Sequence, residues 1–283
     1  MVDLKTLLKE QRDMADKKRD MELEIKNLKA IVANLSRGHS THRIDSTANS
    51  SIKFALISDI HSGNSFHSPR TLNLVYELCL KEGFHDILCA GDVHDGINMY
   101  REQQFECAHY GFEPQMKLFK RFPYDRKISV HFIAGNHDSS FFKAAGLEVG
   151  KHMHELREDW HYLGQDAADI TFSAKDGRPY KVALLHPDGG TAYAISYHMQ
   201  KIIESLSGGD KPNMMVVGHY HKADQLPSYR NICGIQAGTL CAQTPFMKRK
   251  HIAAMMGFWL VEILVGSRRS LTNRIKAEFI PFY

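Results

Sequence analysis

The sequence predicts an α/β protein with a separate helix at its N-terminus, on three observations. From Ile52 onward, short apolar runs alternate with amphipathic stretches, which is typical of strands and helices following one another. Residues 1–36 contain no proline or glycine and repeat apolar side chains every seven residues. Residues 37–51, rich in serine and threonine, join these two segments. We therefore expect a helix at 1–36, a linker at 37–51 and an α/β domain at 52–283.

The composition excludes several classes of protein. A chain of 283 residues with 43% hydrophobic and 24% charged residues can form a globular core of ordinary size. Its longest apolar run, Ile252–Val261, is shorter than the roughly 20 residues of a membrane span, and the N-terminus has no apolar signal region. Five cysteines without a CxxC pair indicate reduced thiols and a cytoplasmic location. A net charge of +4 permits an anionic partner without requiring one.

The heptad repeat of residues 1–36 predicts a coiled coil. Its apolar seam consists of Leu4, Leu7, Met14, Met21, Ile25, Leu28, Val32 and Leu35. Branched residues at one seam position and leucines at the other favour a parallel pair of helices, so we expect a homodimer. The alternative is one amphipathic helix lying on the domain, but such a helix usually has a wider apolar stripe. Residues 37–51 are expected to be a flexible linker, with solvated His39 and His42.

Within 52–283, five apolar runs predict buried strands. They are Ile52–Ile57, Ile87–Ala90, Ile128–Ala134, Val182–Leu185 and Met214–Val217, with a further strand expected at Ala254–Val265. The clearest helix begins at Ser68-Pro69, where a proline occupies the first turn, and ends at Gly83. A second helix is expected from about Ala192 to Leu206.

Each of the five runs is followed by side chains that can bind a metal ion. The motifs are Ser58-Asp59-Ile60-His61, Gly91-Asp92-Val93-His94-Asp95-Gly96, Gly135-Asn136-His137-Asp138, His186-Pro187 and Gly218-His219-Tyr220-His221. Because open α/β sheets place their sites at the carboxyl ends of strands, we expect these side chains to share one pocket. Aspartate oxygen together with imidazole nitrogen suits manganese, iron or zinc. One such motif alone is usually a simple turn, but five in succession indicate a metal site.

This succession of DIH, GD, GNHD, His and GHYH resembles the calcineurin-like metallophosphoesterase family over about residues 52–265. The resemblance implies a four-layer α/β/β/α sandwich and does not include the coiled coil. It also implies two divalent metal ions, manganese before iron or zinc, which clamp the phosphoryl oxygens and activate water for attack. The implied ligands are Asp59, His61, Asp92 and His221 for one ion, and Asp92, Asn136, His186 and His219 for the other.

The resemblance assigns further roles beside the ligands. His137 matches the family histidine that protonates the leaving oxygen or stabilises charge in the transition state. Asp95 matches the aspartate that orients this histidine, and Asp138 is expected to support the same loop. His94 lies one residue from the position where the family's repair nucleases carry a histidine, which makes it a candidate for an indirect role.

The substrate class is less constrained. Protein phosphatases of the family grip a phosphomonoester with two arginines, whose positions here are Gly96 and Ala134. We therefore expect a phosphodiester, either DNA, RNA or a small nucleotide, ahead of a monoester or a phosphoprotein. Lys248-Arg249-Lys250 could bind a phosphate backbone or form a solvated turn, and no interleaved aromatic residue predicts base stacking. A non-catalytic scaffold is less favoured because no ligand position has been lost.

The coiled coil gives a testable prediction. Removing residues 1–50 should convert a dimer into a monomer without abolishing hydrolysis of a small diester, because no candidate ligand lies there. Leu28→Asp should have the same effect, since it places a charge at a buried seam position. Light scattering measures the mass, and a full-length protein that is monomeric at micromolar concentration would contradict the prediction.

Overall fold

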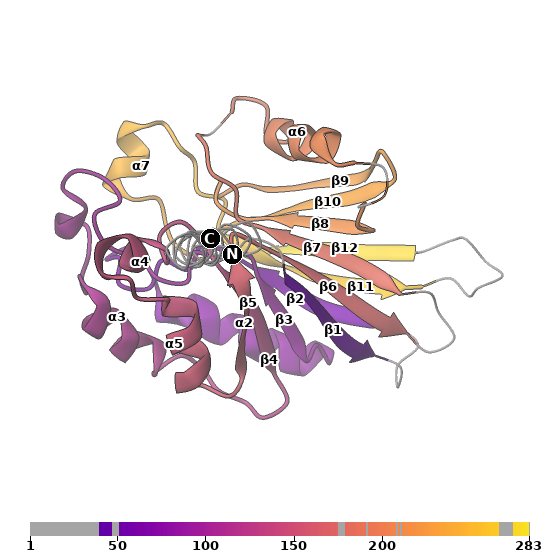
Figure 1. Ribbon diagram of the computed structural model, residues 1–283, viewed down its shortest axis with the longest axis horizontal. Coiled ribbons are helices and arrows are strands. Elements are labelled where there is room, and N and C mark those ends of the chain that lie inside the picture. The colour runs from indigo at the N-terminus through magenta and orange to yellow at the C-terminus, as the bar shows by residue number, and fades with distance from the viewer. Residues whose placement is uncertain are drawn as a thin grey trace, which may run out of the picture. The chain divides into compact units, whose positions relative to one another are not determined.

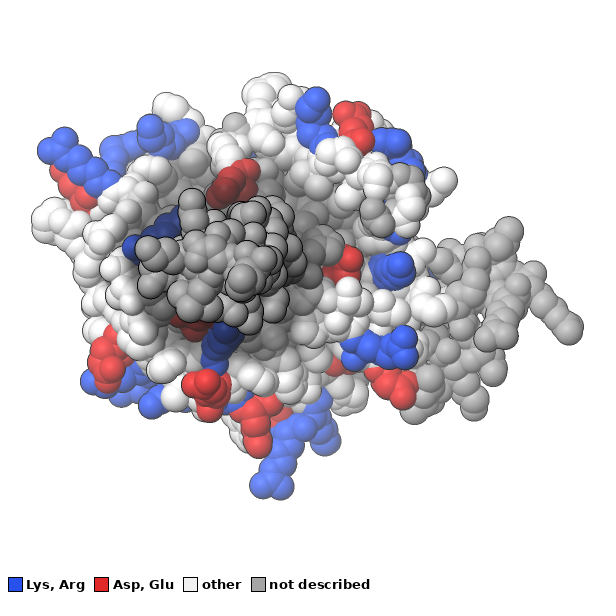
Figure 2. Space-filling model, in the orientation of Figure 1, with Lys and Arg blue, Asp and Glu red and all other residues white. Residues whose placement is uncertain are grey.

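The computed structural model describes residues 40–46, 51–174, 179–190, 192–207, 209, 211–265 and 274–282. Residues 1–36, where the sequence predicts a coiled coil, lie outside the described residues, and that expectation stays a prediction. Among the helices that the structure describes, none has the length and apolar character needed to cross a membrane. On the face drawn in Figure 2, cationic and anionic side chains are interspersed.

Two mixed sheets, each with six strands among the described residues, form the centre of the protein (Figure 1). The first runs in the order β1 (Ser40–Ser46), β6 (Ala167–Ala174), β7 (Tyr180–Leu185), β8 (Met214–Val217), β10 (Ile232–Ala237) and β9 (Ala223–Tyr229). The second runs β12 (Arg274–Pro281), β11 (Gly257–Leu264), β2 (Ile52–Ile57), β3 (Asp86–Cys89), β4 (Ser129–Ala134) and β5 (Trp160–Gln165). Strands β2 to β5 are parallel to one another, and so are β7, β8 and β10.

An apolar layer between the two sheets holds them together. Phe54 of β2 stacks on Phe172 of β6 across this layer, with ring centroids 5.3 Å apart. Leu56 faces the same layer, whereas Ala55 and Ile57 of the same strand face the helices on the opposite side of the sheet. Burial on both faces explains why every residue of β2 except the half-buried Lys53 is apolar.

Helices cover the outer faces of both sheets. The second sheet carries α2 (Pro69–Glu82), α3 (Phe112–Phe119), α4 (Ser140–Ala145) and α5 (Val149–Leu156), and the first carries α6 (Tyr197–Ser205). A 3-10 turn, η2 (Gln103–Phe105), and a short helix, α7 (Pro245–Arg249), lie in long connections. The order of layers is helix, sheet, sheet, helix, which confirms the predicted four-layer α/β fold.

The predicted helix boundaries agree with the structure at α2 and differ at α6. Helix α2 follows Ser68 and ends at Gly83, whose φ of 71° is the left-handed conformation that glycine adopts readily. Helix α6 begins at Tyr197 instead of near residue 192. Its buried residues are Met199 and Ile203, while Tyr193 before it is exposed, so the earlier residues have no sheet to pack against.

The structure corrects the prediction of a flexible linker over residues 37–51. Ser40–Ser46 form strand β1, which pairs in parallel with β6 at the edge of the first sheet. Half-buried and exposed residues alternate along β1, and Ile44 packs against the layer between the sheets. The sequence pattern does not predict this strand, because most of its residues are polar and an edge strand needs few apolar side chains. A truncation that removes the predicted coiled coil must therefore end before Ser40.

Two shortened chains test the role of β1. A chain that begins at Ser51 should melt several degrees below one that begins at His39, because it lacks the backbone pairing of β1 and the packing of Ile44. About 1 kcal/mol of stability corresponds to roughly 2–4 °C for a domain of this size. Thermal unfolding followed by circular dichroism measures the difference. Equal melting temperatures would show that β1 contributes nothing.

Candidate metal centre

The five predicted motifs meet at one edge of the sandwich. Three of them follow the parallel strands β2, β3 and β4 of the second sheet, and two follow β7 and β8 of the first. A hydrogen bond joins the two sheets here, in which the backbone N–H of His219 donates to the side-chain Oδ2 of Asp59 at 3.0 Å. All seven candidate ligands therefore lie in loops that two rigid sheets bring together.

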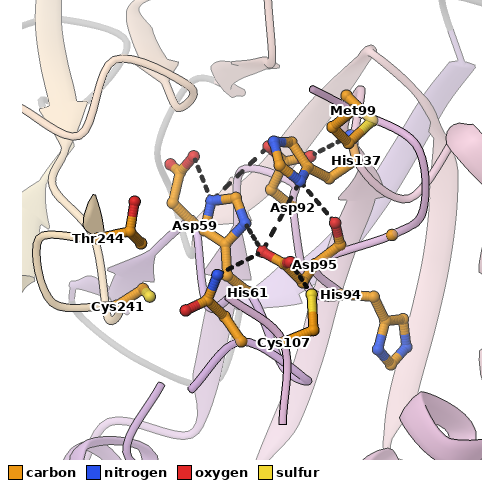
Figure 3. Close-up of polar contacts among 12 residues, drawn as sticks. Asp59, His61, Asp92, His94, Asp95, Met99, Cys107, His137, Cys241 and Thr244 are labelled. Carbon is orange, nitrogen blue, oxygen red and sulfur yellow. Dashed lines mark hydrogen bonds and ion pairs between the residues drawn. The ribbon is translucent and has the colours of Figure 1, made fainter. Parts of the chain in front are cut away.

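The first cluster consists of Asp59, His61 and His221. Asp59 Oδ1 lies 3.2 Å from His221 Nε2 and 3.8 Å from His61 Nε2, and the two imidazole nitrogens are 3.1 Å apart. Figure 3 shows Asp59 and His61 pointing toward each other. Asp92 Oδ2 is 4.0 Å from His61 Nε2, so its carboxylate borders this cluster. One potential ligand atom from each of the three residues lies within 4.8 Å of the others.

The second cluster surrounds the other side of Asp92. Asp92 Oδ2 lies 3.0 Å from His186 Nε2. Asn136 Oδ1 is 3.0 Å from His186 Nε2 and 3.0 Å from His219 Nδ1. Asp92, His186 and His219 form a second group that could hold a metal ion. Asp92 therefore faces both clusters, and its role as a bridging ligand stays a prediction.

Hydrogen bonds outside the clusters select which imidazole nitrogen faces inward. His186 Nδ1 lies 2.6 Å from the carbonyl oxygen of Ala90, and His219 Nε2 lies 2.7 Å from that of Gly189. A nitrogen bound to a carbonyl must carry the proton, which leaves the lone pair on the other nitrogen of the ring. His186 Nε2 and His219 Nδ1 are therefore the atoms available to a metal.

Most of the candidate ligands have an unusual backbone conformation. Positive φ angles occur at Asp59 (53°), His61 (49°), Asp92 (53°), His219 (75°) and His221 (54°). This left-handed region is unfavourable for residues with a Cβ, and such strain gathers at functional sites. These turns redirect side chains from the ends of three strands, β2, β3 and β8, into one small volume.

Burial and charge in these clusters fit divalent metals. Burial opposes ionisation of Asp59, yet the His221 imidazole beside it holds the pKa of this carboxyl well below its usual range. Burial likewise disfavours a charged His186, but the Asp92 carboxylate raises its pKa to about 9, so a metal bound here would displace the proton from Nε2. Asp59 Oδ1 is buried and accepts no hydrogen bond from the described residues. A borderline divalent ion prefers ligands of this kind, ionised carboxylate oxygens among imidazole nitrogens. Asp59 Oδ1 is free to be such a ligand, because no N–H or O–H group of the described residues is bound to it.

His137 lies between the clusters and the solvent side of the site. The backbone N–H of His137 donates to Asp92 Oδ1 at 2.8 Å. The His137 ring stands nearly perpendicular to that of His61, with centroids 4.5 Å apart. Asp95 contacts His137 chiefly through its backbone. His137 Nδ1 lies 2.7 Å from the backbone carbonyl of Asp95 and 3.9 Å from its carboxylate. The carboxylate faces His61 Nδ1 instead, at 3.3 Å, so Asp95 orients both histidines with different atoms.

Asp138 and His94 lie outside the clusters. The buried carboxylate of Asp138 accepts N–H groups from Val93, His94 and Gly135 at 2.9–3.1 Å, which ties the loop after β3 to the loop after β4. Burial and the nearby Asp92 carboxylate raise the pKa of Asp138 to about 7. The ring of His94 is fully buried, points away from the site in Figure 3 and packs edge-on against Phe119. Both residues support the loops.

Three residues that the sequence did not single out hold the Asp95 carboxylate. Asn64 Nδ2 donates to it at 3.2 Å, Gln103 Nε2 at 3.0 Å and Cys107 Sγ at 2.9 Å. Gln103 and Cys107 come from the long connection between β3 and α3, which folds back over the site. No spacing in the sequence indicates this return, because the connection contains no regular period.

A cavity of about 300 Å³ opens above the clusters. Its polar floor includes His61, Asp92, Asn136 and His137. Among the described residues that line it, none is an arginine or a lysine. At Gly96, φ is 69° and a Cβ would collide with the backbone carbonyl of His137. A side chain cannot be accommodated there without moving His137.

Comparisons with known proteins found one matching family and several similar solved structures. The family model of the calcineurin-like phosphoesterases matches residues 52–223. Similar solved structures include an archaeal phosphodiesterase (11% identity, 80% of this chain and 100% of that chain, TM-score 0.42). They also include Vps29 with zinc from Entamoeba histolytica (14% identity, 82% of this chain and 100% of that chain, TM-score 0.38). GAP50 from Plasmodium is a third (12% identity, 82% of this chain and 84% of that chain, TM-score 0.47). No curated protein sequence matched the chain.

The shared position of Asp92 predicts how substitutions affect metal binding. We expect two divalent ions per chain, Asp92→Asn to weaken both, and His61→Ala to weaken mainly one, because His61 is absent from the group formed by Asp92, His186 and His219. Elemental analysis and calorimetric titration with Mn²⁺ measure the number of ions and their affinities. Asp125→Asn, in a turn outside the site, is the matched control. A single ion under saturating conditions would contradict a binuclear site.

Proposed function

The chain belongs to the calcineurin-like phosphoesterase family, and from this we propose that it is a metal-dependent hydrolase of phosphodiesters in nucleic acids or nucleotides. One observation carries the proposal. The candidate metal centre opens into a cavity whose described lining contains no arginine or lysine. The floor of this cavity can bind a phosphate through metals, but its walls supply no cation to neutralise a second negative charge on the phosphate.

The missing cations favour a diester over a monoester. A phosphomonoester is mostly a dianion at neutral pH, and enzymes that select it commonly use a bidentate arginine clamp. Here the family's two arginine positions are Gly96 and Ala134, and the fold leaves no room for a side chain at Gly96. A diester carries one negative charge and has a substituent on both sides, which suits an open cavity without a clamp.

We propose manganese as the native metal, with iron or zinc as alternatives that the same donors accept. Asp59, His61, Asp92 and His221 would hold one ion, and Asp92, Asn136, His186 and His219 the other. When bound, such a pair of ions neutralises charge on phosphoryl oxygens and lowers the pKa of water. The backbone contacts of His186 and His219 support this assignment, because they keep the required lone pairs directed inward.

His137 is proposed to deliver a proton to the leaving oxygen. Its Nδ1 is occupied by the Asp95 carbonyl, so proton transfer to a substrate must use Nε2. Since His137 lines the cavity and its backbone is tied to Asp92, its ring keeps a fixed position relative to both clusters. Asp95 is a positioning residue in this scheme, because its backbone fixes His137 and its carboxylate fixes His61.

We also propose a cytoplasmic homodimer assembled through residues 1–36. The heptad seam of that segment supports dimerisation. The five cysteines, all unpaired, support a reducing compartment.

The proposed activity is tested with matched esters. Purified protein with Mn²⁺ should hydrolyse bis-p-nitrophenyl phosphate faster than p-nitrophenyl phosphate, and a chelator should abolish both rates. Single- and double-stranded DNA assayed in parallel show whether a polymer is accepted. Faster hydrolysis of the monoester would replace the proposal with a phosphomonoesterase, and no metal-dependent turnover would favour a scaffold.

Substitution of His137 separates proton transfer from metal binding. His137→Ala should lower kcat by roughly 10²–10⁴, the usual contribution of a general acid, while the metal content stays unchanged. The loss should be smaller for a nitrophenolate leaving group, which needs little protonation. His152→Ala, on the exposed side of α5, is the control. An equal loss for good and poor leaving groups would assign His137 to charge stabilisation, and a loss of metal would contradict its role.

A further inference from the structure

One side of the cavity is apolar, although the candidate metal centre forms its floor. Five residues make up this apolar side: Met99, Tyr100, Phe246, Met247 and Ile252. Neither phosphate nor metal binding uses them. Within the proposed function, on which this inference rests, we propose that Tyr100 and Phe246 form a stacking site for the planar base of a nucleotide whose phosphate lies at the metal centre.

The two aromatic rings form a prepared surface. Tyr100 and Phe246 are parallel to within 17°, with centroids 4.1 Å apart, and both line the cavity. Tyr100 lies in the connection after β3 and Phe246 in α7, so the pair joins two distant parts of the chain (Figure 1). We refer to this pair as the aromatic wall.

Polar contacts behind the aromatic wall fix its position. The Tyr100 hydroxyl donates to Glu106 Oε2 at 3.0 Å, and Arg249 Nη2 lies 3.6 Å from Glu106 Oε1. At the start of α7, the N–H of Met247 donates to Thr244 Oγ1 at 3.2 Å. Glu106 therefore connects the tyrosine to the helix that carries the phenylalanine. A surface held in this way loses little conformational freedom when a ligand binds.

Size and polarity select a nucleotide among phosphodiesters. A volume of about 300 Å³ is at the lower end of ligand cavities and suits one nucleotide unit. The floor offers sites for charge, and the aromatic wall lines the same cavity. Because its two rings stack on each other, a base would stack on an outer ring face and not between them. Bases of any sequence stack on aromatic side chains, so this arrangement needs no readout of base edges.

The same contacts bear on the interpretation of the cationic segment. Arg249 lies beside Glu106, which binds Tyr100, so this cation contacts the support of the aromatic wall. Lys248 and Lys250 are exposed and form no ion pair with a described residue. On the face of Figure 2, described charges of both signs are interspersed and form no basic stripe. These observations favour a ligand the size of one nucleotide. Lys248 and Lys250 are available to contact the phosphates of a longer nucleic acid.

Binding of small phosphates measures the preference for a base. Calorimetric titration of the Mn²⁺-loaded full-length protein should show thymidine 5′-monophosphate binding about 10-fold tighter than methyl phosphate, the order expected for stacking of one base. Phe246→Ala should bring the two affinities within about 2-fold, and Phe246→Trp should keep the preference. Phe105→Ala, at an exposed phenylalanine of η2 outside the cavity, is the matched control.

Phe246→Leu distinguishes stacking from general apolar contact and guards against misfolding. It keeps an apolar side chain but removes the ring, so most of the preference should be lost while metal content and melting temperature are kept. A preference retained in Phe246→Leu would overturn the stacking site in favour of an aliphatic substituent. Equal affinities of wild-type protein for the two phosphates would overturn it altogether.

Two further measurements separate this inference from the proposed function and show whether the base comes from a polymer or a free nucleotide. Titration requires no turnover, so a base preference in a protein that hydrolyses no diester would refute the proposed function and keep the stacking site. If a polymer is the source, a 20-residue oligothymidylate should compete for the site, and Lys248→Gln with Lys250→Gln should weaken only this competitor and reduce its salt dependence. If a free nucleotide is the source, the double variant should change neither affinity.

Discussion

Two carboxylates buried inside the protein determine the construction of this site. Ionised Asp59 and Asp92 would be strongly destabilising without partners, since a buried charge has lost its water. Histidine rings and two backbone N–H groups, from His219 and His137, compensate them. Gly135 is needed for the same reason, because a Cβ at this position would collide with Asp92 Oδ1. The loops, their glycines and their positive φ angles all serve to surround these two carboxylates.

The clusters also depend on how the two sheets pack. His186, His219 and His221 follow strands of the first sheet, whereas Asp59, His61, Asp92 and Asn136 follow strands of the second. The relative positions of these donors are therefore set by the apolar layer between the sheets, where Phe54 and Phe172 stack. A dense core transmits small displacements, so packing changes far from the site alter the distances between its ligand atoms.

Much of this arrangement was accessible from the sequence, for identifiable reasons. Strands β2 and β8 have the predicted boundaries, because strands buried on both faces are almost wholly apolar in sequence. Strand β1 was missed because Ile44 is its only large apolar residue. Which atoms of Asp95 meet His137 and His61, its backbone carbonyl and its carboxylate, depends on loop geometry that no spacing encodes. The contact between Tyr100 and Phe246 joins distant segments that show no pattern in common.

Gly96 has a consequence for how this enzyme class could diversify. Its left-handed backbone and the absence of space for a Cβ place the carbonyl of His137 against the glycine itself. A single substitution at Gly96 toward a phosphate-gripping cation would therefore displace the backbone of His137. The loop around Gly96 must be remodelled before this position can carry a cation.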